Sequence, residues 1–166
     1  MVQFMGICGH SLQGEDMRMP STHLSLHYHL VFATKNREPF LHAECRPRIH
    51  QYLGGTVNGL GGRIEAVGGT TDHVHLLVEL RATHTLSDFM RELKKQSSVW
   101  MHEEIQIPGF AWQEGYAAFT VSASAVADVR AYVLNQEEHH HIRSFREELV
   151  IMLQRSGVVF DPRYLD

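Results

Sequence analysis

The chain has 166 residues, of which 43% are hydrophobic and 20% charged, and its formal net charge is −4. This length and composition predict one globular domain and exclude wholesale disorder, collagen-like repeats and coiled-coil rods. The acidic balance argues against a generally basic nucleic-acid binder, and no apolar run approaches the roughly 20 residues of a membrane helix, so we expect no membrane partner. Two cysteines, Cys8 and Cys45, cannot form a disulfide framework, which favours a reducing, cytoplasmic location.

The N-terminal segment is predicted to be a tail. Residues 1–19 show neither helical nor alternating periodicity, and they lack the basic start and apolar centre of a secretory signal. We therefore expect them to lie outside the fold and residues 20–166 to form a single domain.

Four segments are predicted to be strands, because each is rich in β-branched, aromatic or apolar residues and is bounded by turn signals. These are residues 24–34, 63–69, 73–80 and 116–121. The second and third are separated only by a short turn, so they should pair as a hairpin.

Four helices are predicted from periodicity and capping signals. They run from Pro47 to about Leu60, from Thr85 towards the break at Pro108, over residues 125–140, and from Ser144 to Gly157. We expect capping boxes at Thr85 with Asp88 and at Ser144 with Glu147, and an N-cap at Ser124. The order βαββαβ plus C-terminal helices predicts an α+β, ferredoxin-like or RRM-like fold, in which helices pack on a four-stranded antiparallel sheet.

Histidines supply the first candidate for chemistry. His73 and His75 flank Val74 in a strand, so both imidazoles point to the same face and can converge on one metal ion while Val74 packs in the core. The spacing alone leaves open that they are hydrogen-bonded core or surface residues. His27 and His29 are interpreted as structural or supporting neighbours. The run at 139–141 is interpreted as a solvated helix end.

A tyrosine and an amide supply the second candidate. Tyr132, Gln136 and His139 fall within about 60° of one another on the predicted helix 125–140. Tyr132 and Gln136 are four residues apart, so the phenol and amide oxygens can approach a common point. The alternative is a tyrosine that packs on a glutamine stem.

Local positive charge supplies the third candidate. Screening limits each charge to a reach of about 8–10 Å, so basic patches can attract a phosphate backbone even on an acidic protein. The candidates for contacts to the DNA backbone are Lys35, Arg37, Arg91, Lys94 and Lys95. The alternative is that these side chains lie on a solvated helix face. Trp112, Tyr116 and Phe119 could stack on bases or pack in the core.

Four spaced motifs together resemble the single-tyrosine transposases of small insertion sequences, a family with a His-hydrophobic-His motif that includes the repeat-associated tyrosine transposases. The motifs are GGTTDHVHLLV at residues 68–78, KKQSS at 94–98, WQEGY at 112–116 and YVLNQ at 132–136. The resemblance runs from about residue 20 to residue 140.

This resemblance implies that residues 20–166 cleave and rejoin single-stranded DNA at hairpin-bearing element ends. His73, His75 and Gln136 would hold Mg²⁺ or Mn²⁺, and Tyr132 would attack the phosphate and form a 5′-phosphotyrosine. No nucleotide cofactor would be needed, and relatives act as homodimers. Whether Tyr132 acts within its own chain stays open at this point.

Two other functions are also open. A zinc hydrolase could use His73 and His75 with a third histidine such as His139 or His29, and it would need no tyrosine nucleophile. A ferredoxin-like module could bind a DNA hairpin without catalysis.

Overall fold

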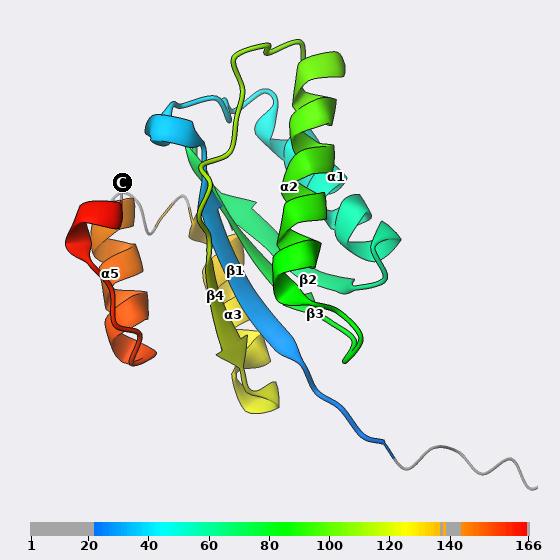
Figure 1. Cartoon of the computed structure of the whole chain (residues 1–166), viewed down its shortest axis with the longest axis vertical. Helices are drawn as coiled ribbons and strands as arrows, with labels where there is room; N and C mark the ends of the chain where they lie inside the picture. Colours follow the sequence, from blue (N-terminus) through cyan, green and yellow to red (C-terminus); the bar gives the residue numbers. More distant parts are fainter. Residues whose placement is uncertain (1–21, 137, 139–143, 166) are drawn as a thin grey trace, which may run out of the picture.

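The computed structural model of the chain describes residues 22–136, 138 and 144–165 (Figure 1). Its elements, in chain order, are β1 (His27–Ala33), α1 (Arg46–Gly59), β2 (Arg63–Gly69), β3 (His73–Glu79), α2 (Leu86–Glu103), β4 (Ala117–Val121), α3 (Val126–Leu134) and α5 (Phe145–Arg155). Short 3-10 helices lie at Lys35–Arg37, Ala123–Ala125 and Pro162–Tyr164.

The strands form one antiparallel sheet in the order β2-β3-β1-β4. β1 pairs with β3 on one side and with β4 on the other, and β2 pairs with β3 at the edge of the sheet. The hairpin of β2 and β3 and the α+β, ferredoxin-like sheet are therefore confirmed.

The two faces of the sheet are covered by different helices (Figure 1). Leu30, Phe32 and Leu76 point towards α1 and α2 and belong to the main hydrophobic core. Val31 points the other way and packs with α5, while α3 packs on β2 and β3. The alternation of side chains along β1 and β3 therefore separates an apolar core from a second face that carries the histidines.

The predicted helix over residues 125–140 is interrupted, because α3 ends at Leu134 and, beyond the turn at Asn135, the described residues Gln136 and Glu138 are helical again. The backbone N–H of Asn135 is shared between the carbonyl oxygens of Ala131 and Tyr132, at 3.1 and 3.3 Å. Such sharing tightens and ends the last turn of a helix. Residues 139–141, which include the candidate His139, lie outside the described residues.

The expected capping box of the C-terminal helix is confirmed. The hydroxyl of Ser144 accepts a hydrogen bond from the backbone N–H of Glu147, and the Glu147 carboxylate accepts one from the backbone N–H of Ser144. The box fixes where α5 begins and hence which of its side chains face the sheet.

The other two expected caps do not form. Thr85 stands before α2 without a side-chain capping bond, and the carboxylate of Asp88 accepts from the guanidinium of Arg91, at 2.6 Å. The hydroxyl of Ser124 lies 3.1 Å from that of Ser122, and α3 begins beyond both. The strands predicted at residues 24–34, 73–80 and 116–121 are also shorter at their ends.

The predicted tail, residues 1–19, lies outside the described residues and its prediction is not tested. Among the described helices, none combines the length and the apolar character needed to cross a membrane.

Gly68 determines how closely α3 lies on the sheet. A Cβ atom at this position would stand 1.7 Å from the carbonyl oxygen of Val133 in α3. Because that neighbour is helix backbone, it cannot turn aside as a side chain would. The absence of a side chain at Gly68 is therefore what allows α3 to rest on β2.

We predict that Gly68→Ala destabilises the protein by about 1–3 kcal/mol, because α3 must move away from the sheet. Gly55→Ala is the matched control: an added Cβ there meets nothing within 4 Å, and alanine favours a helix by about 0.5–1 kcal/mol. Urea denaturation followed by circular dichroism measures both changes, and an unchanged stability of Gly68→Ala would contradict the close approach.

Candidate active site

β3 places two imidazoles on the sheet face opposite the main core. His73 and His75 are both fully buried on the side of α3 and α5, while Val74 between them packs in the core. This is the alternation expected from the strand. Their ring centroids are 5.2 Å apart, so the two rings can serve one site.

α5 adds a carboxylate to this pair. Ligand atoms of His73, His75 and Glu148 all lie within 4.8 Å of one another, and the distance from His75 Nε2 to Glu148 Oε2 is 3.9 Å. Glu148 is only 8% exposed. Two imidazoles and a carboxylate are a donor set that binds divalent transition metals.

Sequence reasoning missed Glu148, although a signal was present. Phe145, Leu149 and Leu153 form the buried stripe of α5, and Glu148 falls within that stripe at 100° per residue. A carboxylate inside an apolar stripe is costly to bury without partners. This signal marks Glu148 as unusual, but it does not predict that Glu148 lies close to β3.

Gln136 and Tyr132 complete the group. Gln136 is 1% exposed, and its Nε2 donates to the Glu148 carboxylate, at 3.2 Å. The Tyr132 ring lies 6.0 Å from the His75 ring and 5.9 Å from the His29 ring, each distance between centroids. The structure thus places Tyr132 beside the histidines of its own chain.

A network behind His73 orients its ring. His73 Nδ1 lies 2.8 Å from Asp72 Oδ1 and 3.0 Å from the Thr70 hydroxyl. Arg37 donates twice to the other Asp72 oxygen, at 2.6 and 3.1 Å, and stacks 3.8 Å from the centre of the Phe145 ring. A proton on Nδ1 that bonds the carboxylate leaves Nε2 as the lone-pair nitrogen, facing the site.

His29 supports His75 in the same way. Its Nε2 lies 2.9 Å from His75 Nδ1, so a neutral His75 that donates from Nδ1 presents its Nε2 to Glu148. The expectation that His29 neighbours the site is confirmed. Its position behind His75 does not fit a third ligand of a zinc hydrolase.

Burial dominates the protonation of the site. It lowers the pKa of His29 to about 4 and also lowers that of His73, where the Asp72 hydrogen bond opposes the shift. It raises the pKa of Glu148 to about 7, with Arg37 acting in the opposite direction. For Asp72 burial alone would raise the pKa, but the His73 hydrogen bond and the Arg37 charge outweigh it, and the pKa falls to about 2.

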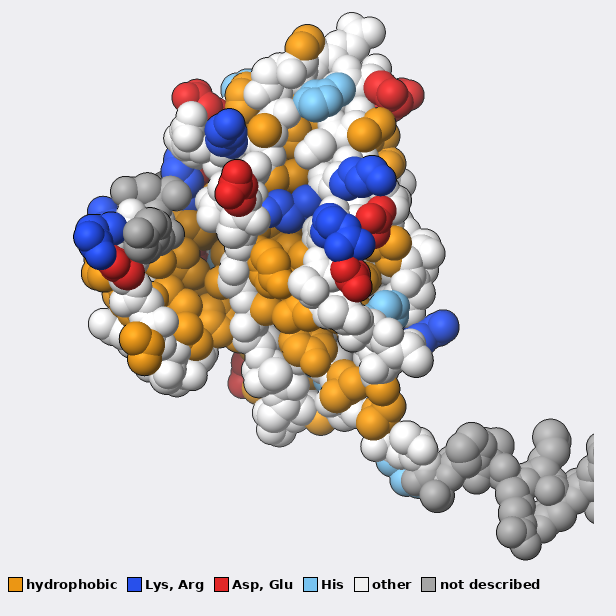
Figure 2. Space-filling model, viewed as in Figure 1, with side chains coloured by type: hydrophobic (Ala, Val, Ile, Leu, Met, Phe, Trp, Pro, Cys, Tyr) orange, Lys and Arg blue, Asp and Glu red, His pale blue; other side chains and the backbone are white. Residues whose placement is uncertain are grey.

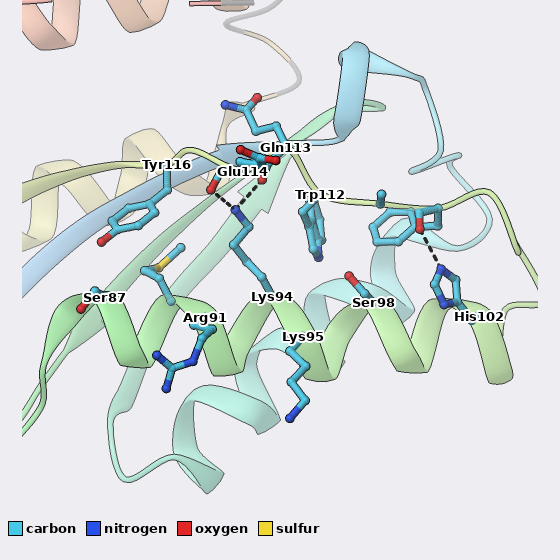
Figure 3. A pocket seen from close by; sticks show the side chains of 13 residues that line it. Ser87, Arg91, Lys94, Lys95, Ser98, His102, Trp112, Gln113, Glu114 and Tyr116 are labelled. Carbon is cyan, nitrogen blue, oxygen red and sulfur yellow. Dashed lines mark hydrogen bonds between the residues drawn. The ribbon is translucent and has the colours of Figure 1, made fainter. Parts of the chain in front are cut away.

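The three candidate DNA contacts on α2 differ in how far their side chains are held by the protein (Figure 3). Lys94 donates to the backbone carbonyls of residues 113–115 and so holds the loop that leads into β4. Arg91 and Lys95 are more than 60% exposed, although each lies beside a carboxylate of α2. Trp112 is a core residue that donates to Ser97, at 2.9 Å.

The remaining candidates are also divided between surface and interior. Lys35 is exposed, whereas Arg37 is committed to Asp72 and Phe145. Tyr116 is 37% exposed, and Phe119 packs partly buried beside α5. The face in Figure 2 shows exposed cations over α2 beside a broad apolar surface.

We predict that the metal-free protein loses stability as pH rises because of Glu148. Its folded pKa of about 7 lies above its ordinary value of 4.5, so its contribution is complete below pH 4.5 and is lost as pH rises through 7. The change is at most about 3 kcal/mol. Urea denaturation in EDTA, from pH 5 to 8, gives the free energy of unfolding of wild type and of Glu148→Gln. The difference between the two free energies isolates the contribution of Glu148. A difference that does not change with pH would contradict the prediction.

Comparisons with known proteins identify the family. Residues 22–136 match the family described as "Transposase IS200 like". The chain is 28% identical over 131 residues to the transposases for insertion sequence element IS200 of Salmonella typhimurium and Salmonella typhi, covering 75% of this chain and 86% of each relative. A crystal structure of a proposed transposase from Deinococcus radiodurans aligns with a TM-score of 0.57 and 28% identity, over 72% of this chain and 98% of that one. The chain belongs to the family of IS200-like transposases.

Proposed function

We propose that this protein cleaves and rejoins single-stranded DNA at hairpin-bearing element ends, with Tyr132 as the nucleophile. The observation that carries the proposal is the position of the Tyr132 ring, 6.0 Å from the ring of His75, beside a buried group of possible metal ligands. Family membership supports a transposase activity, and the resemblance noted in the sequence supports the tyrosine mechanism.

The donor set supports a divalent metal at this site. His73 and His75 offer imidazole nitrogens, Glu148 a carboxylate and Gln136 an amide oxygen, all from buried side chains. Oxygen donors suit Mg²⁺ and Mn²⁺, and the two imidazoles favour Mn²⁺ over Mg²⁺. When bound, such an ion polarises a phosphate oxygen and neutralises developing negative charge.

Tyr132 supplies the covalent step. A phenol has a pKa near 10 and is a weak nucleophile at neutral pH, so it must be held close to the phosphorus atom. The phenol oxygen forms a bond to phosphorus while the bond to the 3′ oxygen breaks. The phenol gives its proton to water, and the leaving 3′ oxygen takes a proton from water. The products are a 5′-phosphotyrosine and a 3′-hydroxyl. A 3′-hydroxyl can later attack the same phosphorus and release Tyr132. The phosphotyrosine link conserves the energy of the phosphodiester bond, so no nucleotide cofactor is needed.

Exposed cations are proposed to guide the DNA backbone. Lys35, Arg91 and Lys95 have exposed side chains, which suits contacts to phosphates that are strong at low salt. Arg37 and Lys94 act indirectly, since Arg37 holds Asp72 and Lys94 holds the loop before β4. We further propose that the protein acts as a homodimer, as the resemblance implies.

We predict that Tyr132→Phe abolishes a covalent protein–DNA adduct, because phenylalanine lacks the attacking oxygen. The assay incubates the protein and Mn²⁺ with labelled single strands tiled across the DNA that flanks its gene, followed by denaturing electrophoresis. His73→Ala should reduce the adduct about a hundredfold, since it removes one of the proposed metal ligands.

Tyr52→Phe is the matched control for loss of a phenol oxygen. Tyr52 stacks on Trp100 between α1 and α2, so its substitution should leave the adduct unchanged. An adduct that persists in Tyr132→Phe would overturn the proposed nucleophile. DNA hydrolysis without any adduct, dependent on zinc and unaffected by Tyr132→Phe, would instead support a zinc hydrolase.

We also predict that Asp72→Asn weakens Mn²⁺ binding about 10- to 100-fold, because it loosens the orientation of His73. Asp88→Asn, which removes a carboxylate from a surface pair on α2, should leave Mn²⁺ affinity unchanged. Titration calorimetry measures both affinities. Equal affinities in the two variants would show that the Asp72 contact does not support the metal site.

A further inference from the structure

A cavity of about 270 Å³ adjoins the candidate active site at the edge of the sheet. It is lined by the first turns of α1, by Gly68 and Gly69 of β2, and by Leu134 and Gln136. Gln136 therefore belongs both to this cavity and to the group around His73. A ligand in the cavity would lie next to the site where the reaction takes place.

Two side chains of α1 give the cavity its chemical character. Among the described residues that line it, Arg46 is the only one with a formal charge. Its Nε donates to the carbonyl oxygen of Leu41, at 3.2 Å, which holds the guanidinium at the start of the helix. His50 lies one helical turn further on, on the same side of α1.

His50 is prepared to donate a hydrogen bond. Burial and the charge of Arg46 lower its pKa to about 4, so the imidazole is neutral at pH 7 and keeps one N–H. Its Nε2 is buried and has no hydrogen-bond partner in the described part of the chain. Buried polar atoms without partners are uncommon and call for an explanation, such as a ligand.

The rest of the lining suits a chain backbone more than a base. β2 is an edge strand, so the cavity opens where no further strand of the described sheet covers it. Gly68 and Gly69 bring no side chain to the lining, and the Cβ position of each is taken by backbone of the protein itself, the carbonyl oxygens of Val133 and His73. Apart from His50, the described lining residues have no aromatic ring on which a base could stack.

We propose that this cavity holds the phosphate group adjacent to the scissile phosphate of single-stranded DNA, with Arg46 and His50 as positioning residues. A guanidinium and an imidazole N–H match the anionic oxygens of a phosphodiester. Holding this phosphate fixes the strand so that the next phosphate reaches the group of His73, His75 and Tyr132. The inference rests on the proposed function and extends it to the path of the strand.

The first test measures DNA binding without cleavage. Fluorescence anisotropy in EDTA gives the Kd for a labelled single strand from the flanking DNA at several salt concentrations. Arg46→Gln should weaken binding about tenfold and reduce the slope of log Kd against log salt by about 0.7, the value for one phosphate contact on a single strand. Arg46→Lys should restore most of the affinity, which a purely structural defect would not allow.

Arg48→Gln is the matched control, since it makes the same charge change two residues along α1. Arg48 lies over the ring of Trp100, at 5.6 Å, on the side of α2. It should change neither the Kd nor the salt slope. Equal effects of Arg46→Gln and Arg48→Gln would overturn the proposal.

The second test locates the phosphate on the strand. Neutral methylphosphonate is placed at one linkage at a time, and KM and kcat for adduct formation are measured. In wild type, methylphosphonate at the linkage next to the cleavage point should raise KM about tenfold with little change in kcat. In Arg46→Gln, the methylphosphonate at that one linkage should raise KM no further, because the contact to that phosphate is already lost. If methylphosphonate raises KM equally in wild type and in the variant at every linkage, the assignment is contradicted.

The two proposals fail differently. If wild type forms no adduct with any strand, while Arg46→Gln still binds more weakly than Arg48→Gln, the proposed reaction is wrong and the phosphate site stands. If wild type forms the adduct and the two glutamine variants bind and react alike, the reaction stands and the phosphate site is wrong.

Discussion

The burial of two imidazoles on one face of β3 is the constraint on which the site depends. An imidazole in a dry interior is costly unless its nitrogens have partners. Asp72 bonds Nδ1 of His73, and His29 bonds Nδ1 of His75. These two contacts repay the burial and also turn both Nε2 atoms towards Glu148. One arrangement thus satisfies the buried imidazoles and groups possible metal-ligand atoms together.

The close approach of α3 brings Tyr132, the proposed nucleophile, to this arrangement. Because Gly68 has no side chain, α3 lies directly on β2, and Tyr132 reaches the histidine face from its own chain. The same contact brings Gln136 to the end of β2, where it meets both Glu148 and the cavity beneath Arg46. A small residue in the sheet therefore controls the distance between a helix and the site.

The two faces of the sheet carry different kinds of residue. The face under α1 and α2 holds the main hydrophobic core and carries exposed cations on its outer surface (Figure 2). The face under α3 and α5 holds the titratable residues in a second, smaller set of apolar contacts.

Local rules in the sequence were sufficient for the order of elements, the shared face of His73 and His75, and the helix cap at Ser144. Each of these depends on neighbours in the chain, such as the alternation of a strand or the pairing of residues i and i+3. The approach of Glu148 to β3, and the use of Arg37 and Lys94 inside the structure, were decided by tertiary contacts. A carboxylate, a guanidinium or an ammonium has no preferred partner until the fold brings one near, so charge and spacing alone do not distinguish a ligand of DNA from a support of the protein.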